Sequence, residues 1–212
     1  GLPALGLGSS SKADVGDDAV FIDGTGSHVD VHIAAKQEFA GYWEYLLDEA
    51  IFITPAHAAW GGAALVGGDG RLLGIGSLLL QMERGGESFN INMVVPIDLL
   101  PPILDDLLTQ GQVDKPPRPW LGAFSAEDNG KVVVASVANG SPAAKAGLKA
   151  GDIISDIRNE EVQGLADFYR KVWSGGPAGV EVPMRILRDG RESWLRVKSA
   201  DRNSFLRKPP LQ

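Results

Sequence analysis

One short run of alternating residues has the side chains needed to bind a metal ion. His28, Asp30 and His32 are each separated by one apolar residue. On a β-strand this spacing puts both imidazoles and the carboxylate on one face, where they could ligate a divalent metal. The alternative is a barrel strand whose polar face lies in water. We favour the barrel strand, because residues on the same face of one strand rarely converge on a metal ion without a further ligand from elsewhere. We therefore predict no metal site and no cofactor.

The chain offers few groups for nucleophilic catalysis. It contains no cysteine, which excludes thiol catalysis, disulfides and zinc–thiolate sites. Ser10, Ser77 and Ser88 are candidates for a catalytic triad only in the sense that serine occurs there, and serines are common in loops. We do not predict a triad built on them. The aromatic run Tyr42–Tyr45 is read as a packing corner rather than a binding cage.

Length and composition are those of a globular protein. The 212 residues suffice for one large domain or two small ones, with 44% apolar and 22% charged residues. A net charge of −7 without a basic patch argues against a nucleic-acid partner. No apolar run approaches the roughly 20 residues of a membrane helix, and nothing at the start resembles a signal peptide. Gly1–Leu5 reads like the middle of a folded domain, as though upstream sequence were missing.

The first half of the chain has the pattern of a small β-barrel. Strand-like runs separated by turn signals lie near residues 18–22, 28–35, 48–53, 63–66, 71–80 and 89–95. Gly67–Gly70 is a tight hairpin connection, and six short strands with glycine-rich turns are typical of an antiparallel barrel. An amphipathic helix over residues 97–110 follows, with Pro101 and Pro102 in its first turn, where proline is tolerated.

The second half mixes strands and helices. Residues 112–119 are polar and proline-rich and form the only clear linker. After the linker, the sequence predicts a strand over 131–137, a helix over 165–173, and a hairpin of strands 180–188 and 192–197. The tail from Asp201 is expected to be loosely held.

The most informative stretch runs from Ser141 to Asp152. Ser141 is a suitable N-cap, Pro142 can open a helix at its first turn, and Gly147 can end it in the left-handed conformation. Asp152 then belongs to a turn that leads into an apolar strand over residues 153–157. This unit of helix, stop and strand resembles the core segment of PDZ domains, in particular those of the HtrA/Deg proteases.

The resemblance to PDZ domains covers residues 118–200. Trp120–Ala123 is similar to the loop that binds the peptide carboxylate in HtrA-type PDZ domains. In such a loop Gly122 lets the backbone turn, so that neighbouring N–H groups converge and bind a terminal carboxylate without a basic side chain. Taken alone, Trp120 and Leu121 would be read as core residues at the start of a strand, but the surrounding pattern favours the binding loop.

A bound peptide would then lie as a strand beside residues 121–125. Its last side chain would enter a pocket formed by Leu121, Ala123 and the helix 165–173. Ala123 is smaller than the usual branched residue, which predicts a wider or shallower pocket. The predicted peptide-binding residues are Trp120, Leu121, Gly122, Ala123, Leu165, Phe168, Tyr169 and Val172.

Residues 61–100 resemble the end of a trypsin-like protease domain of the same HtrA/Deg family. The resemblance rests on three segments: Gly61–Val66, Gly70–Ser77 and Asn92–Leu99. In the family a serine nucleophile lies at the start of this region, and if the spacing to Leu65 and Val66 is kept, Gly61 occupies its place. The alternative register puts Trp60 there, and neither residue can attack a carbonyl. The N–H groups of Gly61 and Gly62 are predicted to form at most an oxyanion-hole-like nest.

The resemblance also implies that the catalytic base is absent from this chain. A trypsin-like site lies between two six-stranded barrels, and the first barrel supplies the histidine and the aspartate. The strand count here accounts for one barrel, which the resemblance identifies as the second. Of the three histidines, His57 sits four residues before Gly61, whereas the family places its base far upstream. In the protease family the region that matches Tyr42–Tyr45 borders the specificity pocket, so the resemblance leaves a substrate-groove role open for this run.

We therefore predict a mainly β fold, with a six-stranded antiparallel, trypsin-like half barrel followed by an α+β PDZ domain. The expected divisions are residues 1–111 for the C-terminal barrel of a protease domain, 112–119 for the linker, 120–200 for the PDZ domain and 201–212 for the tail.

Two functional hypotheses follow from the resemblance. The first is a serine-type endopeptidase of HtrA/Deg type that acts in protein quality control. On this hypothesis the present chain is inactive by itself. The alternative is a non-catalytic peptide-binding module, a pseudoprotease scaffold with a PDZ domain. Expected partners are polypeptide C-termini or unfolded proteins, and the missing first barrel or another copy of the chain in a homo-oligomer. The family implies the periplasm or cell envelope.

Overall fold

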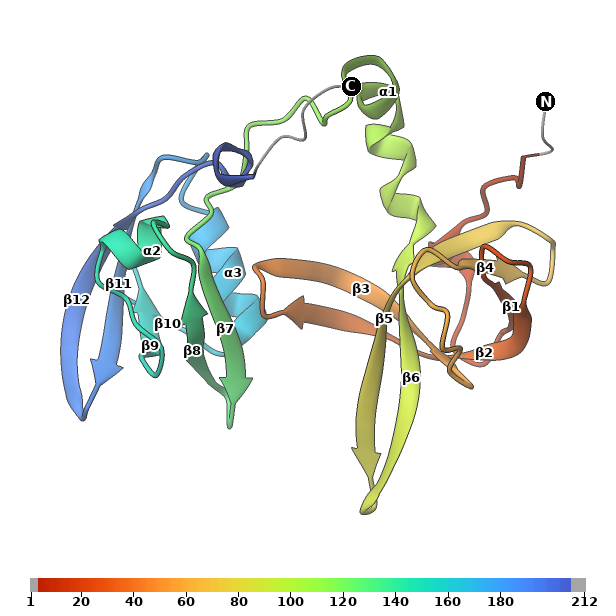
Figure 1. The fold of residues 1–212 in the computed structure, drawn as a ribbon, viewed down its shortest axis with the longest axis horizontal. Coiled ribbons are helices and arrows are strands. Elements are labelled where there is room, and N and C mark those ends of the chain that lie inside the picture. Colours follow the sequence, from red (N-terminus) through yellow and green to blue (C-terminus); the bar gives the residue numbers. More distant parts are fainter. Residues whose placement is uncertain (1–3, 207–212) are drawn as a thin grey trace. The chain divides into compact units, whose positions relative to one another are not determined.

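The structure, a computed structural model, describes residues 4–206 and falls into two compact units (Figure 1). The first unit holds the chain through Phe39 together with Leu47–Asp114. The second holds Ala40–Leu46 and the chain from Lys115 onward. Each unit has its own cluster of buried apolar side chains. The assignment of residues 40–46 to the second unit was not foreseen from the sequence.

Six antiparallel strands form a closed barrel, as the sequence predicted. In chain order they are β1 (Asp18–Ile22), β2 (His28–Gly41), β3 (Tyr45–Thr54), β4 (Ala64–Gly67), β5 (Leu72–Arg84) and β6 (Glu87–Pro96). Around the barrel the order is β1-β2-β3-β6-β5-β4, and β4 closes it by pairing with β1. The buried core side chains are Ala13, Ala19, Phe21, Val31, Ile33, Ile51, Ile53, Ala63, Leu65, Leu73 and Val94.

Strands β5 and β6 are longer than the sequence pattern indicated. They run on to Arg84 and from Glu87, joined by Gly85 and Gly86, which both have positive φ. Two such residues form the tight hairpin turn that matches the twist of a β-ribbon. The predicted bounds fell short because the outer part of this ribbon has no buried face, and hence no apolar alternation. Figure 1 shows the ribbon extending away from the barrel.

The segments flanking the barrel are short helices. The single helix expected over residues 97–110 is divided into a 3₁₀ turn, η2 (Ile97–Leu99), and α1 (Pro101–Gln110). The division falls where Pro101 opens α1, because proline lacks the N–H that would continue the preceding turn. None of the α1 residues is buried. At the other end, η1 (Ser10–Lys12) is tied to η2 by Asp98, whose carboxylate accepts the N–H groups of Ser10 and Ser11 at 3.0 and 2.8 Å.

The second unit has the predicted α+β composition. Its strands are β7 (Ala123–Asp128), β8 (Lys131–Val137), β9 (Ile153–Ile157), β10 (Glu160–Glu161), β11 (Glu181–Arg188) and β12 (Arg191–Lys198). They form a sheet in the order β12-β11-β9-β8-β7, and the short β10 pairs with β9. The helices are α2 (Pro142–Lys145), α3 (Leu165–Trp173) and the 3₁₀ turn η3 (Arg202–Phe205). The described part of the predicted tail thus includes a helical turn, while residues 207–212 lie outside the described residues.

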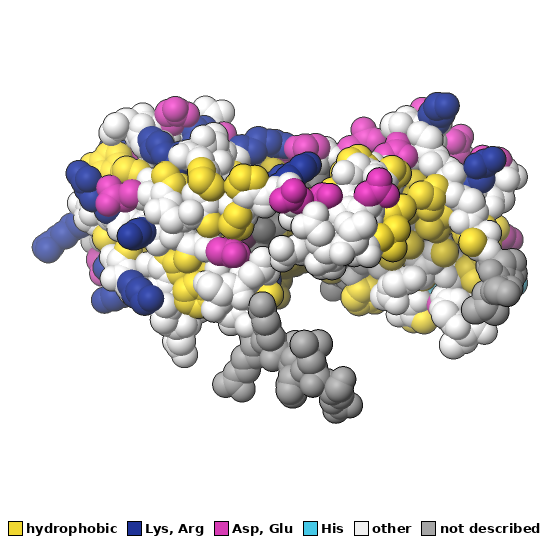
Figure 2. All heavy atoms as spheres, turned by 90° about the horizontal axis from the view of Figure 1, so that it is seen from above, with side chains coloured by type: hydrophobic (Ala, Val, Ile, Leu, Met, Phe, Trp, Pro, Cys, Tyr) yellow, Lys and Arg dark blue, Asp and Glu magenta, His cyan; other side chains and the backbone are white. Residues whose placement is uncertain are grey.

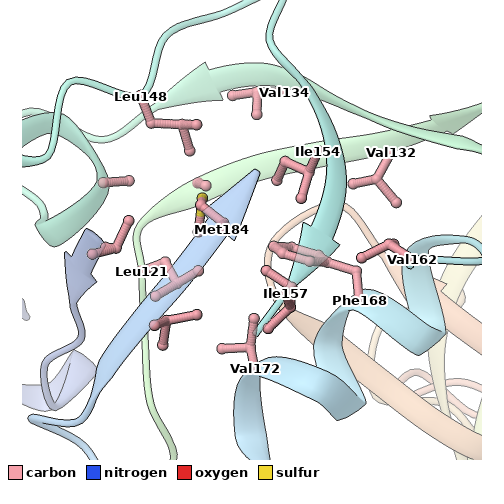
Figure 3. Close-up of a cluster of buried hydrophobic side chains, with 14 of the residues drawn as sticks. Leu121, Val132, Val134, Leu148, Ile154, Ile157, Val162, Phe168, Val172 and Met184 are labelled. Atoms are coloured by element: carbon pink, nitrogen blue, oxygen red, sulfur yellow. The ribbon is translucent and has the colours of Figure 1, made fainter. Parts of the chain in front are cut away.

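A single core joins the sheet to α3 (Figure 3). In the close-up, Phe168 and Val172 on α3 point toward Ile157 and Met184 on the strands. The buried members of the core are Leu121, Ala123, Val132, Val134, Ala143, Leu148, Ile154, Ile157, Val162, Leu165, Phe168, Tyr169, Val172, Val182, Met184, Ile186 and Val197. The amphipathic spacing of α3 is thereby explained, since one face of the helix is buried against the sheet.

Helix α2 and its stop have the predicted local structure. The Ser141 hydroxyl accepts the N–H of Ala144 at 3.2 Å, as an N-cap does, and Gly147 follows with a φ of +85°. Beyond it, Asp152 is almost fully buried and forms two contacts of 2.6 Å with the Arg188 guanidinium. Burial by itself raises the pKa of Asp152, but the hydrogen bonds and charge of Arg188 bring it below its ordinary value.

The surface carries charges of both signs. On the face drawn in Figure 2, Lys and Arg side chains are interspersed with Asp, Glu and apolar ones, and no broad patch of one sign is seen there. Within residues 4–206, no helix has the length and apolar character needed to cross a membrane.

We predict that Asp152→Asn lowers the free energy of unfolding by about 2 kcal/mol, because the Arg188 guanidinium loses the negative charge of its buried partner. Denaturant unfolding of the full chain measures this. Because the pKa of Asp152 is lower in the folded state, the stabilisation is present above about pH 4 and is lost as the pH falls below it. Glu160→Gln, an exposed acid on β10, is the control and should change stability by less than about 0.5 kcal/mol. Equal effects of the two substitutions would contradict the prediction.

Candidate peptide-binding site

The loop before β7 has a backbone turn that only glycine fits. Gly122 has a φ of +74°, and a Cβ atom there would lie 2.4 Å from the Cβ of Ser141. The carbonyl of Gly122 accepts the N–H of Ala138 at 2.9 Å, and that of Leu121 accepts the N–H of Ala143 at 2.8 Å. With both carbonyls held inside the domain, the orientation of the loop is fixed by α2 and the segment before it.

Three successive N–H groups of this loop converge on one carboxylate, that of Glu44. The Gly122 nitrogen lies 2.7 Å from Oε1, and the nitrogens of Leu121 and Ala123 each lie 3.2 Å from the same oxygen. Leu121 also lies 3.1 Å from Oε2. This is the geometry by which backbone N–H groups bind a carboxylate without a basic side chain.

Glu44 reaches the loop from residues 40–46, which lie along the edge of the second unit's sheet. Two residues earlier, the Tyr42 carbonyl accepts the N–H of Ser125 on β7 at 3.0 Å. Because β7 is the edge strand, its outward N–H groups are open to such pairing. Glu44 has a φ of +60°, and this left-handed conformation turns the chain back toward Tyr45.

The four predicted binding residues of α3 are core residues in this structure. Leu165, Phe168, Tyr169 and Val172 are each at most 5% exposed. Of these four side chains, only that of Tyr169 has a polar group. Its hydroxyl donates a hydrogen bond to the Gly41 carbonyl at 2.7 Å and accepts one from the Glu44 N–H at 3.2 Å. Ala40 and Leu46 pack on the same core. Residues 40–46 thus lie over the place where the sequence predicted the side-chain pocket. The peptide-binding role of the four α3 residues stays a prediction.

A pocket of about 370 Å³ opens beside Glu44. Trp120 and Trp173 line it together with Arg118, whose guanidinium carbon lies 4.6 Å from the centroid of the Trp173 ring. Arg202 lines it as well, and its positive charge acts on Glu44. Trp120 itself is held by two backbone hydrogen bonds of 3.0 Å to Ala200.

The predicted nucleophile position lies in the turn before β4. A Cβ atom at Gly61 would meet nothing within 4 Å, so a side chain would fit there. Gly62 has a φ of +80°, and its N–H donates to the Gly76 carbonyl at 2.9 Å. That N–H is therefore engaged within the barrel, and the oxyanion-binding role of the glycine pair stays a prediction.

His57 is the histidine nearest to Gly61 in sequence, and its tautomer prevents it from acting as a base toward Ser27. Its Nε2 atom lies 3.4 Å from the Ser27 hydroxyl, while its Nδ1 accepts the N–H of Ala59 at 3.0 Å. An imidazole that accepts at Nδ1 carries its proton on Nε2, so it donates toward Ser27 and cannot remove a proton from it. Buried Asn92 fixes this loop, accepting the His57 N–H at 2.7 Å.

The three serines considered from the sequence lie apart from one another. Ser10 bonds to Asp98, and Ser88 accepts a hydrogen bond from Gln81 at 3.2 Å. Ser77 lies on β5 at a register shift between the strands β5 and β6. None of these positions brings together the serine, base and orienting acid that a triad requires.

The alternation at the start of β2 is as predicted for a barrel strand. His28, Asp30 and His32 are exposed, whereas Val31 and Ile33 are buried in the barrel core. Among residues 4–206, no group of three or more histidine and acidic side chains is placed to hold a metal ion. These residues therefore form the water-facing side of the strand.

Glu44 is the site residue that sequence reasoning missed. The run Tyr42–Tyr45 was taken for a packing corner, and ring contacts such as Tyr42 with Trp43, at 4.9 Å between centroids, do occur there. The sequence signals for another role were a single acid among aromatic residues and a substrate-groove role left open by the resemblance, and neither points to the loop at Gly122. The partners of Glu44 are 77 to 79 residues away in sequence, so no short-range pattern could identify them.

A comparison with protein families matches the PDZ domain family model to residues 119–198. Among curated relatives, Serine protease Do-like HtrA of Bacillus subtilis (strain 168) is 30% identical over 153 residues. That match covers 65% of this chain and 33% of the relative. The chain is a homologue of the HtrA/DegP serine proteases with a PDZ domain. Periplasmic serine endoprotease DegP of Escherichia coli (strain K12) is 29% identical over 143 residues. That match covers 62% of this chain and 29% of DegP.

Solved structures of the HtrA type resemble the whole of this homologue. The HtrA-type protease AlgW with tripeptide matches with a TM-score of 0.56 at 25% identity, covering 99% of this chain and 71% of AlgW. AlgW with decapeptide matches with the same TM-score and identity, covering 66% of AlgW. The homologue spans about a third of the length of the two curated proteases named above.

Burial raises the pKa of Glu44 from its ordinary value of 4.5 to about 7, although the three N–H groups and the charge of Arg202 lower it. We predict that the Gly122 amide resonance titrates with a midpoint near pH 7 in nuclear magnetic resonance spectra, because its N–H is bonded to Glu44. Since the pKa is raised, docking of residues 40–46 is strongest below pH 4.5 and weakens as the pH rises through 7.

Glu44→Gln is the control for this titration and should leave the Gly122 resonance unchanged between pH 5 and 8. The amide of Gly130, exposed and outside the site, serves as the internal reference. Two other ionisable groups face Glu44: the Tyr169 hydroxyl, whose pKa is raised by burial, and the Arg202 guanidinium, whose charge lowers the pKa of Glu44. A Gly122 midpoint near 4.5 would show that Glu44 is in water, contrary to the prediction.

Proposed function

We propose that this chain binds the C-terminal ends of polypeptides through its PDZ domain. The observation that carries the proposal is the convergence of the Leu121, Gly122 and Ala123 N–H groups on one carboxylate. A peptide would place its terminal carboxylate there. Its backbone would then pair with the edge strand β7, and the N–H of Ser125 would be the next donor along that strand.

The peptide's last side chain would lie between the loop and α3. Leu121 and Ala123 would form one wall, and Leu165, Phe168 and Val172 the other. These side chains are apolar, which favours peptides with an apolar last residue. Trp120 and Tyr169 complete the proposed set, Trp120 beside the pocket at Glu44 and Tyr169 with its hydroxyl at the rim.

The barrel is proposed to be the second barrel of an HtrA/Deg protease domain. The names of the relatives, serine protease and periplasmic serine endoprotease, support a serine endopeptidase in protein quality control as the activity of the complete protein. On this proposal residues 1–111 are the barrel, 112–119 the linker, 120–200 the PDZ domain and 201–212 the tail. The periplasm or cell envelope would be its location, since homologues such as DegP of Escherichia coli are periplasmic serine endoproteases.

The chain by itself is proposed to be inactive. Gly61 supplies no hydroxyl at the predicted nucleophile position, and His57 faces Ser27 with the wrong tautomer for a base. The base and its aspartate would come from a first barrel other than the one that residues 4–206 form. The second candidate function, a pseudoprotease scaffold that holds peptides without cutting them, is favoured by the same glycine.

Association with a first barrel or with another copy of the chain is proposed for the β5–β6 ribbon. Met82 and Phe89 on this ribbon are 39% and 43% exposed. Met82 and Phe89 are paired across the two strands, so they lie side by side. An apolar face of this kind in water favours association, and a homo-oligomer would cover it.

We predict that a peptide with a free C-terminal leucine binds the full chain, and that the same peptide with an amidated end binds at least about tenfold more weakly. The reason is the loss of hydrogen bonds to a charged group. A fluorescein-labelled peptide that repeats residues 36–43 and ends in leucine is the probe, and fluorescence anisotropy measures binding.

Gly122→Ala should abolish this difference between the free and amidated ends, because the new Cβ clashes with Ser141 and turns the loop. Gly130→Ala is its matched control: Gly130 also has a φ of +74°, but a Cβ there meets nothing within 4 Å. Equal affinity of the wild-type chain for the two peptide ends would show that the loop does not bind carboxylates.

We predict that Gly61→Ser gains no proteolytic activity, because a hydroxyl without an adjacent base stays a weak nucleophile. The substitution fits the open space and should change the free energy of unfolding by less than about 0.5 kcal/mol. Release of fluorescent fragments from labelled casein measures activity, and Gly68→Ser, another open position, is the control. Hydrolysis that a serine-directed covalent inhibitor abolishes, in the wild type or the variant, would overturn the proposed inactivity.

A further inference from the structure

We propose that residues 41–44 are an internal ligand of the PDZ groove, with the Glu44 side chain in the place of a peptide's terminal carboxylate, so that a peptide binds only by displacing them. The inference rests on the proposed function, because it assumes that the groove accepts peptide C-termini. It goes beyond that function by stating what holds the groove in the absence of a peptide.

The hydrogen bonds of this segment, here called the internal ligand, are those expected of a peptide. Its carboxylate accepts all three N–H groups of the loop, and its Tyr42 carbonyl accepts the next one along β7, that of Ser125. The spacing of two residues between these contacts is that of an extended strand, in which alternate residues face the same partner. An external peptide would need the same donors.

Because the chain continues beyond Glu44, this residue has no free main-chain carboxyl group, and only its side chain can supply a carboxylate to the loop. The structure meets this constraint with the left-handed φ of +60° at Glu44 and with a hydrogen bond from its N–H to Tyr169. The backbone turns away while the side chain stays in the loop. A side-chain carboxylate can replace a terminal one there because the loop binds oxygen atoms and makes no use of the chain end.

Aromatic packing shapes the internal ligand for the groove. The Trp43 ring stacks on Tyr45 at 5.6 Å between centroids and lies against Gly41, where an added Cβ would come within 3.0 Å of it. Tyr42 contacts Phe124 of β7 at 6.1 Å between ring centroids. These contacts order the segment before any peptide arrives, which lowers the entropy cost of its docking.

Occupation of the groove by the chain's own residues has a measurable consequence. The observed dissociation constant of a peptide equals its intrinsic value divided by the fraction of molecules with an open groove. Removing the Glu44 carboxylate should raise that fraction and tighten peptide binding. The loop and α3, which the peptide itself contacts, remain unchanged.

The test compares wild type with Glu44→Ala in the full chain, using the labelled peptide that ends in free leucine. We expect the variant to bind it at least tenfold more tightly than wild type, and to keep the weaker binding of the amidated peptide. Glu49→Ala is the matched control: Glu49 lies on β3 outside the internal ligand, where it pairs with Lys36 at 2.8 Å. It should bind like wild type.

The outcomes separate the inference from the proposed function. Equal or weaker binding by Glu44→Ala, with the free end still preferred over the amide, overturns the inference and leaves the proposed function standing. Failure of both proteins to bind the free end overturns the proposed function. If Glu44→Ala does not fold, the wild type decides: saturating peptide should abolish the pH titration of the Gly122 resonance, and a persisting titration overturns the inference.

Discussion

The convergence of three backbone N–H groups on one carboxylate is the interaction on which this structure's chemistry depends. It needs no basic side chain, only a loop whose N–H groups point the same way. Gly122 makes that possible, because its positive φ and its contact with Ser141 exclude every side chain. The bound oxygen atoms belong to Glu44, a residue of the same chain.

The rest of the second unit keeps this loop in place. The carbonyl groups of the loop are bonded to the segment around α2, and α2 is followed by Asp152, whose buried carboxylate is paired with Arg188 on β11. The capped helix α2 and the buried ion pair that follows it thus attach the loop to the sheet. The Ser141–Asp152 motif was informative in the sequence because its N-cap and its glycine stop act over few residues.

The barrel has an ordered turn at the position where the sequence predicted a nucleophile. Asn92 fixes the loop that precedes Gly61, yet the open space at Gly61 holds no hydroxyl. His57 takes part in a local network with Ser27 and Ala59, and this network sets its tautomer. Hydrogen bonds of the surrounding loop therefore order this turn although Gly61 contributes no side chain to it.

The sequence by itself determined the six barrel strands, helix α3, the PDZ motif and the family, because alternation, capping and glycine turns act between near neighbours. It also indicated the loop around Gly122, since a glycine at that point of the motif has one physical explanation. The partner of that loop could not be predicted. Glu44 is far from it in the chain, and its role depends on residues 40–46 lying along β7. Only the tertiary structure brings the acid of an aromatic turn to the N–H groups of that loop.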